Sequence, residues 1–327
     1  MTELLAGIDV GTSGVKAGVF DPAGRLLGLG RSAHRVESPH PGWAQTDPEH
    51  WWQGFLAALR QACEEAEVEP GAIAALGLSV LFPAVAPLDA RGRALYPALL
   101  YCDQRSLPQV QQIEERIPRA EYQAITGNRL APGTCAVTSM RWLHDEEPCA
   151  YAAAKVLGLV NTFFVLRLTG SFVTDPSNAA LSGLVDIRDP WRWSDVVCEK
   201  LGIEQQRLPQ ISGATQVVGQ VTRAAAAETG LESGTPVVVG AGDAVAAALG
   251  AGVRMDEVAV YTAGSTDCVS VVMPSPAVDS AWINCAYVPR ATWLAIGPTN
   301  ASGVSVEGLA RSVIASDDLT LMPGLPS

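Results

Sequence analysis

A short stretch near the start of the chain combines groups that can handle phosphate. Residues 7–18 read G-I-D-V-G-T-S-G-V-K-A-G, so Asp9 ends an apolar run. A carboxylate there is costly to bury unless it is paired or bound to a cation. Asp9 can coordinate Mg²⁺ through water, and Lys16 can neutralise developing charge. Backbone amides and the hydroxyl groups of Thr12 and Ser13 can hold phosphate oxygens. The glycines are equally typical of a tight β-hairpin without a ligand, but the flanking Asp9 and Lys16 favour phosphate binding.

A second acidic residue follows a glycine turn late in the chain. The sequence G-A-G-D-A at 240–244 places Asp243 between a buried strand and an apolar helix. Asp243 could cap the helix that begins at Ala244, or it could accept a proton from an attacking hydroxyl as a general base. The two roles are compatible only if the side chain faces a cleft and not the amides of its own helix.

An antiparallel meander must position the first motif. Residues 4–10 and 15–20 are apolar runs on either side of the G-T-S-G turn. The sequence D-P-A-G at 21–24 is a strong turn signal and leads into a third strand over 26–36. The first hairpin of this meander therefore carries the phosphate-type motif at its tip.

A helix is predicted after the Pro/Gly loop at 39–48. Asp47 is suited to the N-cap and Pro48 to the first turn. Trp51 and Trp52 fall on the apolar face of this helix, so we expect them in the core and not stacked on a ligand.

The remaining elements follow from the same local signals. We predict a strand over 73–80, a short hairpin around 89–92 and a mostly helical region from 105 to 230. Residues 235–252 read as a buried strand, a glycine turn holding Asp243 and an apolar helix, and 258–273 read as strand, A-G-S-T turn and strand. The opening hairpin thus has a counterpart near the end of the chain.

This repeated unit predicts two domains of similar plan that face each other across a cleft. The predicted domains are residues 1–245 and residues 246–327. In this arrangement we expect Asp9 and Asp243 to meet across the gap, where the terminal phosphate of a nucleotide would lie.

The composition excludes several classes of function. The chain is 48% hydrophobic and 17% charged, with a net charge of -12 and without a basic cluster, which argues against a nucleic-acid surface. The seven cysteines are scattered without C-x-x-C spacing and indicate reduced thiols. The sequence has no run of about 18 apolar residues and no basic leader, so we expect a cytoplasmic protein without a membrane partner.

The motifs, taken in order, resemble the FGGY family of carbohydrate kinases, and within it the xylulokinases. The family belongs to the actin, hexokinase and heat-shock-chaperone superfamily, and the resemblance runs from about residue 4 to residue 315. Each segment is weak alone, but seven in register are specific. The segments are G-I-D-V-G-T-S-G-V-K (7–16), P-G-W-A-Q-T-D-P-E-H-W-W (41–52), Y-C-D-Q-R (101–105), T-D-P-S-N-A (174–179), V-V-G-A-G-D-A (238–244), A-G-S-T (263–266) and T-N-A-S-G (299–303).

The resemblance implies a fold and a reaction. The fold is α/β of the actin-like ATPase (ribonuclease H-like) type, with duplicated domains of mixed sheet flanked by helices and an incomplete second domain. The reaction is ATP-dependent transfer of the γ-phosphoryl group to a hydroxyl of a small sugar or polyol, a pentulose such as xylulose. ATP and Mg²⁺ are the implied cofactors.

The resemblance also implies roles for individual residues. Asp243 is the catalytic base, and Asp9 and Asp243 are the metal-binding residues. The sugar site includes Asp103, Phe82 and Arg105. The residues implied to bind the nucleotide phosphates are Asp9, Gly11, Thr12, Ser13 and Lys16 in the first loop and Gly264, Ser265 and Thr266 in the second.

Two features depart from the family pattern. Xylulokinases usually have a glycine-glutamine-methionine-histidine stretch where this chain has S-V-L-F-P-A (79–84), and Cys102 replaces the usual asparagine before Asp103. An apolar patch around Phe82 cannot make the same hydrogen bonds, and such contacts discriminate strongly between substrates. Another polyol or ketose therefore remains an alternative to D-xylulose.

The second departure concerns length. Family members continue well beyond the predicted helix at 304–314, and the continuation supplies the adenosine pocket. The alternative functions are a truncated, non-catalytic sugar-binding relative and a fragment of a longer kinase. An incomplete second domain would also expose apolar sheet surface, which predicts self-association as a homodimer.

Overall fold

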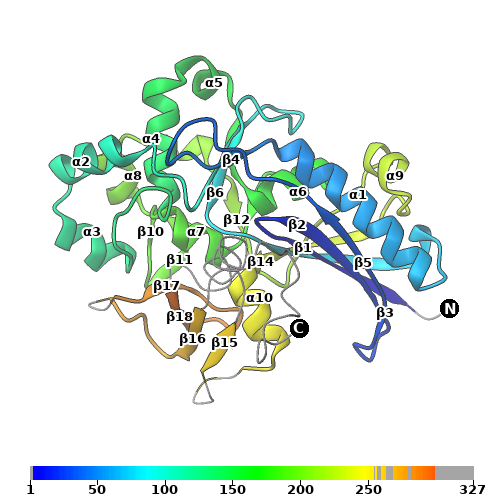
Figure 1. Ribbon diagram of the computed structural model, residues 1–327. Coiled ribbons are helices and arrows are strands. Elements are labelled where there is room, and N and C mark those ends of the chain that lie inside the picture. Colours follow the sequence, from blue (N-terminus) through cyan, green and yellow to red (C-terminus); the bar gives the residue numbers. More distant parts are fainter. Residues whose placement is uncertain (1–2, 254, 256–258, 263–267, 279–280, 299–327) are drawn as a thin grey trace, which may run out of the picture.

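The computed structural model describes residues 3–253, 255, 259–262, 268–278 and 281–298. Its helices and strands form a mixed α/β architecture in which sheets are flanked by helices (Figure 1). Within the described residues, no helix has both the length and the apolar composition of a membrane span.

The central sheet has six strands and both parallel and antiparallel pairs. β1 pairs in antiparallel fashion with β2 and in parallel with β5, and β14 pairs in parallel with β5 on its other side. The predicted meander and the predicted strand at 73–80 are confirmed. In sheet order the strands are β13 (Val217–Gln220), β14 (Pro236–Gly242), β5 (Ile73–Val80), β1 (Leu4–Val10), β2 (Gly14–Phe20) and β3 (Leu26–Ala33).

Helix α1 (Pro48–Glu65) packs against β2 and β3, as its apolar face predicts. The Asp47 side chain accepts a hydrogen bond from the Glu49 amide, which confirms the predicted N-cap. Trp51 and Trp52 are 1% and 0% exposed, so the prediction that they belong to the core is confirmed. Their rings contact Phe163 and Phe164 of helix α6 (Val160–Thr169), which completes this core layer.

A second, smaller sheet takes one strand from before β5 and three from after it, and most of the helices follow β5. The predicted hairpin at 89–92 joins two of its strands. The region from 105 to 230 is less uniformly helical than predicted, because short strands alternate with its helices. The sheet contains β4 (Gln45–Thr46), β7 (Ala98–Leu100), β6 (Ala84–Leu88) and β8 (Val156–Leu159). The remaining elements are α2 (Leu107–Arg116), α3 (Arg119–Thr126), α4 (Ala136–Glu146), α5 (Pro148–Ala153), β9 (Val173–Thr174), α7 (Pro176–Ser182), β10 (Val185–Asp186), β11 (Asp189–Trp193), α8 (Asp195–Leu201), β12 (Gln210–Ile211) and α9 (Arg223–Thr229).

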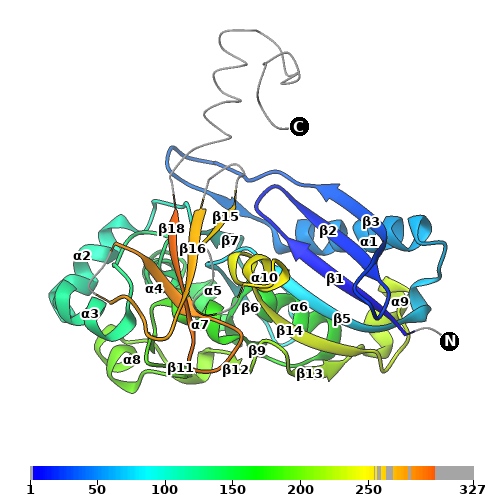
Figure 2. The ribbon, with the colours of Figure 1, turned by 90° about the horizontal axis from the view of Figure 1, so that it is seen from below.

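The last described sheet lies beside helix α10 (Asp243–Gly250), on the side of the molecule away from α1 (Figures 1 and 2). Its hydrophobic residues share one core with α7 and α10. The predicted strands around the A-G-S-T turn are confirmed as an antiparallel pair, whereas the turn itself and the predicted helix at 304–314 lie outside the described residues. In sheet order the strands are β15 (Val260–Thr262), β16 (Cys268–Met273), β18 (Trp293–Pro298) and β17 (Ile283–Ala286). The domain boundary near residue 245 stays a prediction.

Two glycines of β3, Gly28 and Gly30, let this strand approach α1 closely. This contact provides a test of the fold. A Cβ atom at Gly30 would overlap the backbone carbonyl of Ala58 in α1. We expect Gly30→Ala to lower the free energy of unfolding in urea by about 3 kcal/mol, because overpacking forces backbone shifts. Gly77→Ala in β5 is the matched control: its Cβ would meet no atom within 4 Å, and we expect a change below about 0.5 kcal/mol. Equal losses in both variants would contradict this packing.

Candidate active site

Three parallel strands bring the two predicted acidic residues to one edge of the central sheet. The register aligns Asp9 of β1 with Ser79 of β5, and Ser79 with Ala241 of β14. Asp243 follows directly after β14. Asp9 and Asp243 therefore approach each other along one sheet edge and not from two facing sheets, which corrects the expectation that they meet across a gap between domains. The carboxyl edge of parallel strands is also where α/β proteins bind ligands.

Asp9 is paired on both of its carboxylate oxygens. The Ser79 hydroxyl donates to Oδ1 at 2.8 Å, and the Lys16 ammonium donates to Oδ2 at 3.1 Å. Lys16 lies directly opposite Asp9 in the β1–β2 register, with side-chain exposures of 58% and 36%. These contacts explain how a carboxylate can end a buried strand, and they leave it open to solvent.

The G-T-S-G segment forms the tip of the β1–β2 hairpin. The Gly11 amide donates to the Gly14 carbonyl at 2.9 Å and closes the turn. Thr12 is partly exposed and Ser13 is exposed, so both hydroxyl residues face accessible space next to Asp9. The hairpin interpretation is thus correct for the backbone, and it is compatible with a loop that holds phosphate.

Asp243 occupies the first position of α10, while Gly242 occupies the N-cap position. The capping alternative is therefore wrong in its strict form, although Asp243 Oδ1 accepts a hydrogen bond from the Ala244 amide at 2.7 Å. Gly240 has a φ of +72° where β14 shifts register against β5, and this bulge sets the direction of the chain into Asp243.

Burial raises the pKa of Asp243 to about 7. The Ala244 amide opposes this shift, the negative charge of Asp9 adds to it, and Lys16 lowers it. The two carboxyl groups are therefore close enough to repel each other. A proton or a cation between them would relieve that repulsion.

Two aromatic residues line the same edge. The Phe82 ring lies against Gly242, where an added Cβ would come within 2.6 Å of the ring. Phe82 was predicted in the sugar site, and the structure places it beside the backbone that carries Asp243. Tyr101 was not predicted. Burial raises its pKa, while a hydrogen bond with Thr12 lowers it and the charge of Asp243 raises it further. Its signal was the first position of the Y-C-D-Q-R motif.

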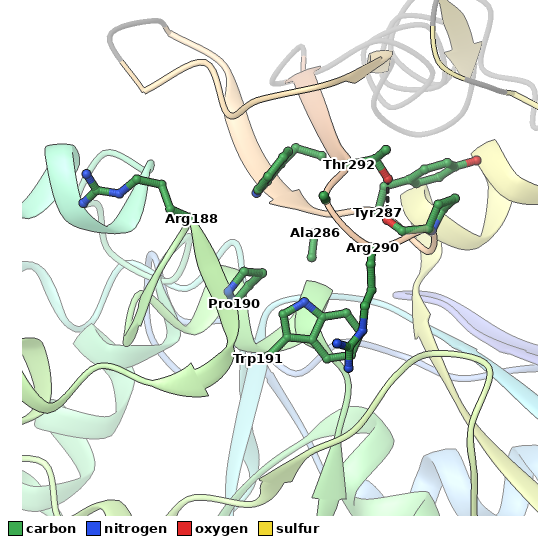
Figure 3. A pocket seen from close by; sticks show the side chains of 10 residues that line it. Arg188, Pro190, Trp191, Ala286, Tyr287, Arg290 and Thr292 are labelled. Carbon is green, nitrogen blue, oxygen red and sulfur yellow. Dashed lines mark hydrogen bonds between the residues drawn. The ribbon is translucent and has the colours of Figure 1, made fainter.

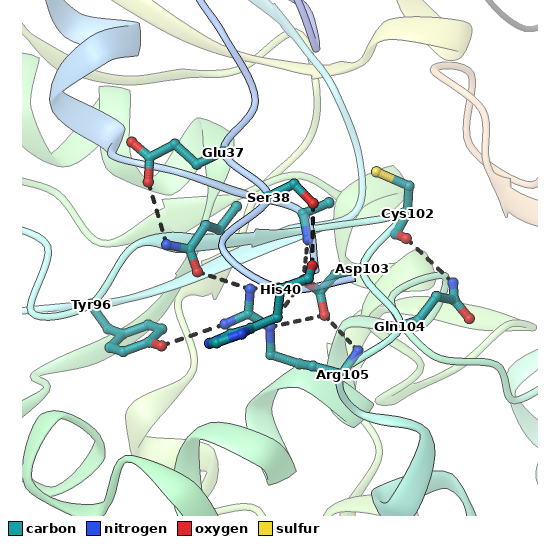
Figure 4. A network of polar contacts seen from close by, with 10 residues as sticks. Glu37, Ser38, His40, Tyr96, Cys102, Asp103, Gln104 and Arg105 are labelled. Carbon is teal, nitrogen blue, oxygen red and sulfur yellow. Dashed lines mark hydrogen bonds and ion pairs between the residues drawn. The ribbon is translucent and has the colours of Figure 1, made fainter. Parts of the chain in front are cut away.

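Asp103 and Arg105 form a buried ion pair within a network of polar contacts (Figure 4). Their side chains are 0% and 1% exposed. The Asp103 carboxylate accepts hydrogen bonds from the Ala44 amide at 2.6 Å, from the Arg105 amide at 2.8 Å and from Arg105 Nε. Arg105 also donates to Gln45 at 2.9 Å, and its guanidinium lies 3.7 Å from the centre of the Trp43 ring.

This network favours a supporting role for the pair. The carboxylate of Asp103 offers no exposed surface to a sugar in this conformation. The pair instead joins the segment 43–45 to the segment 101–105, and so fixes the backbone next to Tyr101. Direct contact of Asp103 and Arg105 with substrate stays a prediction.

The four histidines differ in burial. His40, His50 and His144 are exposed. His34 is half-buried behind the phosphate-type loop, and its backbone amide donates to the Ser13 carbonyl at 3.0 Å. Burial and the charge of His50 lower the pKa of His34. Its position after a strand gave no sequence signal for this contact.

A cavity of about 220 Å³ lies elsewhere, between β11 and the connection from β17 to β18 (Figure 3). Trp191, Tyr287 and Thr292 contribute to its lining, and the Arg290 guanidinium lies 4.2 Å from the centre of the Trp191 ring. None of the predicted site residues within the described part of the chain lines this cavity, so it is separate from the edge that carries Asp9 and Asp243.

The residues present fit a magnesium ion that is shared with a phosphate ligand. Within the described residues, no three His, Cys, Asp or Glu side chains form a metal-binding group. Mg²⁺ is usually bound by one or two carboxylates together with substrate phosphates and water. Asp9 and Asp243 supply two carboxylates whose mutual repulsion a divalent cation would relieve. The predicted second phosphate loop, Gly264, Ser265 and Thr266, lies outside the described residues.

The buried ion pair gives a second prediction. Arg105→Met would leave the Asp103 carboxylate buried and unpaired, and we expect a loss of about 3–5 kcal/mol in the free energy of unfolding. Arg93→Met is the matched control, because Arg93 makes the same type of contact with Asp89 but is 73% exposed. We expect the control to lose less than about 1 kcal/mol. Similar losses, measured by urea denaturation, would contradict the supporting role.

The raised pKa of Asp243 gives a third prediction. Its folded pKa of about 7 exceeds the ordinary value of 3.8, so the folded state binds more protons than the unfolded state between these values. Stability must then fall as the pH rises through this window. Asn cannot ionise. Between pH 5 and pH 8, the free energy of unfolding of Asp243→Asn should therefore fall by about 1–3 kcal/mol less than that of wild type.

Urea unfolding at the two pH values checks this expectation. The control is Asp186→Asn, since the Asp186 side chain is 38% exposed on the β10–β11 hairpin. Parallel pH profiles for wild type and Asp243→Asn would show that Asp243 is not the titrating group.

Comparison with known proteins places the chain in one family. The family model described as "FGGY family of carbohydrate kinases, N-terminal domain" matches residues 4–250. The xylulose kinase of Escherichia coli (strain K12) is 31% identical over 262 residues, which are 80% of this chain and 52% of that protein. The glycerol kinase of Thermococcus gammatolerans (strain DSM 15229 / JCM 11827 / EJ3) is 32% identical over 76% of this chain and 50% of its own length.

The structural comparison agrees with the sequence comparison. The crystal structure of xylulose kinase from Rhodospirillum rubrum matches with a TM-score of 0.87 and 26% identity, covering 96% of this chain and 64% of that one. The chain thus spans about half to two thirds of the length of the relatives it matches. The matched fold, with mixed sheets flanked by helices, is the actin-like ATPase fold expected from the motifs. On these grounds the chain belongs to the FGGY family of carbohydrate kinases.

Proposed function

We propose that the chain carries the sugar-binding and catalytic part of an ATP-dependent carbohydrate kinase. The reaction is transfer of the γ-phosphoryl group to a hydroxyl of a small ketose or polyol. The observation that carries this proposal is the convergence of Asp9, Asp243 and the 11–13 hairpin tip at the carboxyl edge of one parallel sheet segment.

The phosphate end of the site is built from the β1–β2 hairpin. The exposed tip at 11–13 offers amides and hydroxyl groups to phosphate oxygens, and Lys16 adds a positive charge beside Asp9. When bound, Mg²⁺ would be held by Asp9 and Asp243 and would neutralise phosphate charge. We assign Gly264, Ser265 and Thr266 to the opposite phosphate loop on the strength of the family motif.

The acceptor end of the site is built around Asp243. A base with a pKa close to the working pH is well suited to accept a proton from the attacking hydroxyl. The half-buried position of Asp243 supplies that pKa, because burial disfavours the charged form. The remaining work of phosphoryl transfer is positioning and charge neutralisation.

The acceptor is a pentulose such as xylulose in this proposal. Relatives named xylulose kinase and glycerol kinase match the chain at similar identity, which supports a small polyhydroxylated acceptor without fixing which one. Phe82, beside Gly242, forms an apolar wall in the segment where xylulokinases usually carry polar groups. This wall favours an acceptor that turns a C–H face towards it.

One alternative function is sugar binding without turnover of ATP. The relatives that match include kinases of different small acceptors, and the sugar-binding part is the part matched by the family's N-terminal domain model. Calorimetry separates the two functions: binding of a pentulose and of ATP·Mg²⁺ supports the kinase, whereas binding of the pentulose alone supports the sugar-binding alternative.

The general-base role gives a fourth prediction. Asp243→Ala should lower kcat by about 10²–10⁴-fold, because a positioned base contributes roughly that factor. The KM for the sugar should change less than about 3-fold, since the base acts mainly in the transition state. ADP release coupled to a panel of pentuloses, hexuloses and polyols provides the measurement. Asp186→Ala is the control and should retain wild-type kcat. Folded wild-type protein that is silent across the whole panel would overturn the proposal.

A further inference from the structure

We propose that Ser177 is a positioning residue for Asp243. Its hydroxyl fastens the backbone just before Asp243 to the buried carboxylate of Asp175 at the start of α7. This inference rests on the proposed function, in which Asp243 is the base. Among the predicted site residues that the structure describes, none forms a hydrogen bond with the Ser177 side chain, so its effect passes through Gly242.

The Ser177 hydroxyl makes two hydrogen bonds that point in different directions. It donates to Asp175 Oδ2 at 2.5 Å and accepts from the Gly242 amide at 3.0 Å. Ser177 is 1% exposed and Gly242 is buried, so water does not compete for these bonds. The second bond joins residues that are 65 positions apart in sequence.

Asp175 is a rigid anchor for this chain of bonds. Its Oδ1 accepts from Asn161 Nδ2 at 2.9 Å and from Asn178 Nδ2 at 2.6 Å, and it is 1% exposed. Asn161 belongs to α6, which packs into the core of the central sheet. The link from Gly242 therefore ends in the buried core beside the central sheet.

Gly242 is held from both sides. Ser177 binds its amide, and the Phe82 ring occupies the space where a Cβ would lie, at 2.6 Å. Asp243 is the next residue and the first of α10. A shift of the Gly242 backbone must therefore move the Asp243 carboxylate relative to Asp9. A misplacement of about 1 Å can lower a rate by roughly 10²-fold.

Capping of α7 does not account for the Ser177 hydroxyl. Asp175 caps the helix through the backbone amides of Ser177 and Asn178, and those bonds do not need the hydroxyl. Ser182, at the end of the same helix, offers a contrast. Its buried hydroxyl donates to the Ala179 carbonyl and accepts from the Leu184 amide, so its bonds stay local. Ser177 alone of these two serines reaches the segment that carries the base.

The test compares Ser177→Ala with Ser182→Ala, which removes an equally buried hydroxyl from the same helix, and with Ser177→Thr, which keeps the hydroxyl. Hydrogen exchange resolved to residues 240–244 reports the Gly242 amide without requiring activity. We expect Ser177→Ala to exchange at least 10-fold faster there, and Ser182→Ala to exchange as wild type does. Kinetics should show kcat lowered about 10–100-fold in Ser177→Ala with the sugar KM within 3-fold, and recovery of at least half of wild-type kcat in Ser177→Thr.

Several outcomes would overturn the inference. These are unchanged Gly242 exchange in Ser177→Ala, equal acceleration in Ser182→Ala, or a rise in sugar KM that accounts for the whole loss of kcat/KM. If wild type transfers no phosphoryl group, the proposed function fails, and the exchange data alone decide whether Ser177 holds Gly242. If Ser177→Ala does not fold, Ser177→Cys takes its place, because its thiol still fills the site but is a weaker hydrogen-bond acceptor than the hydroxyl.

Discussion

The parallel pairing of β1, β5 and β14 is the constraint on which the rest of the site depends. It brings two carboxylates, Asp9 and Asp243, to one sheet edge, where their charges repel and burial disfavours ionisation of Asp243. The repulsion between the two carboxylates persists in the folded protein. The pairing of Asp9 with Lys16 reduces it on one side, and a proton or a divalent cation would reduce it on the other. This geometry is compatible with a divalent cation between the two carboxylates, as the proposed function requires.

Much of the fold could be predicted because its signals are local. The meander, the Asp47 cap, and the strand and helix that meet at Asp243 depend on residues within a few positions of one another, and these elements are confirmed, although the helix begins at Asp243 without a separate turn. The order of strands in the sheet could not be derived in the same way. β14 lies beside β5 although their residues are far apart in the chain, and no local pattern encodes that pairing. The short strands between 105 and 230 were missed for a related reason, since two-residue strands carry too little periodicity.

In the candidate site, too, features marked by local sequence could be predicted and features set by tertiary packing could not. Asp9 and Asp243 were predicted because glycine turns mark them, and the structure places them on one edge. Asp103 and Arg105 were predicted from a motif, but a motif specifies residue type and not burial, and the two side chains bind each other in the interior. Tyr101 and His34 were missed because their relation to the 11–13 loop arises only from tertiary packing. Sequence thus indicated the chemistry of the site better than its supporting contacts.

Helix α10 carries a predicted site residue at its start and packs against another sheet along its length. Its first residue is Asp243, and its hydrophobic side shares a core with the β15–β18 sheet and α7. A rigid rotation of that sheet would move α10 with it, and would change the separation between the Asp9 and Asp243 carboxylates. Such a change in separation would alter the basicity of Asp243, because its repulsion from Asp9 depends on their distance.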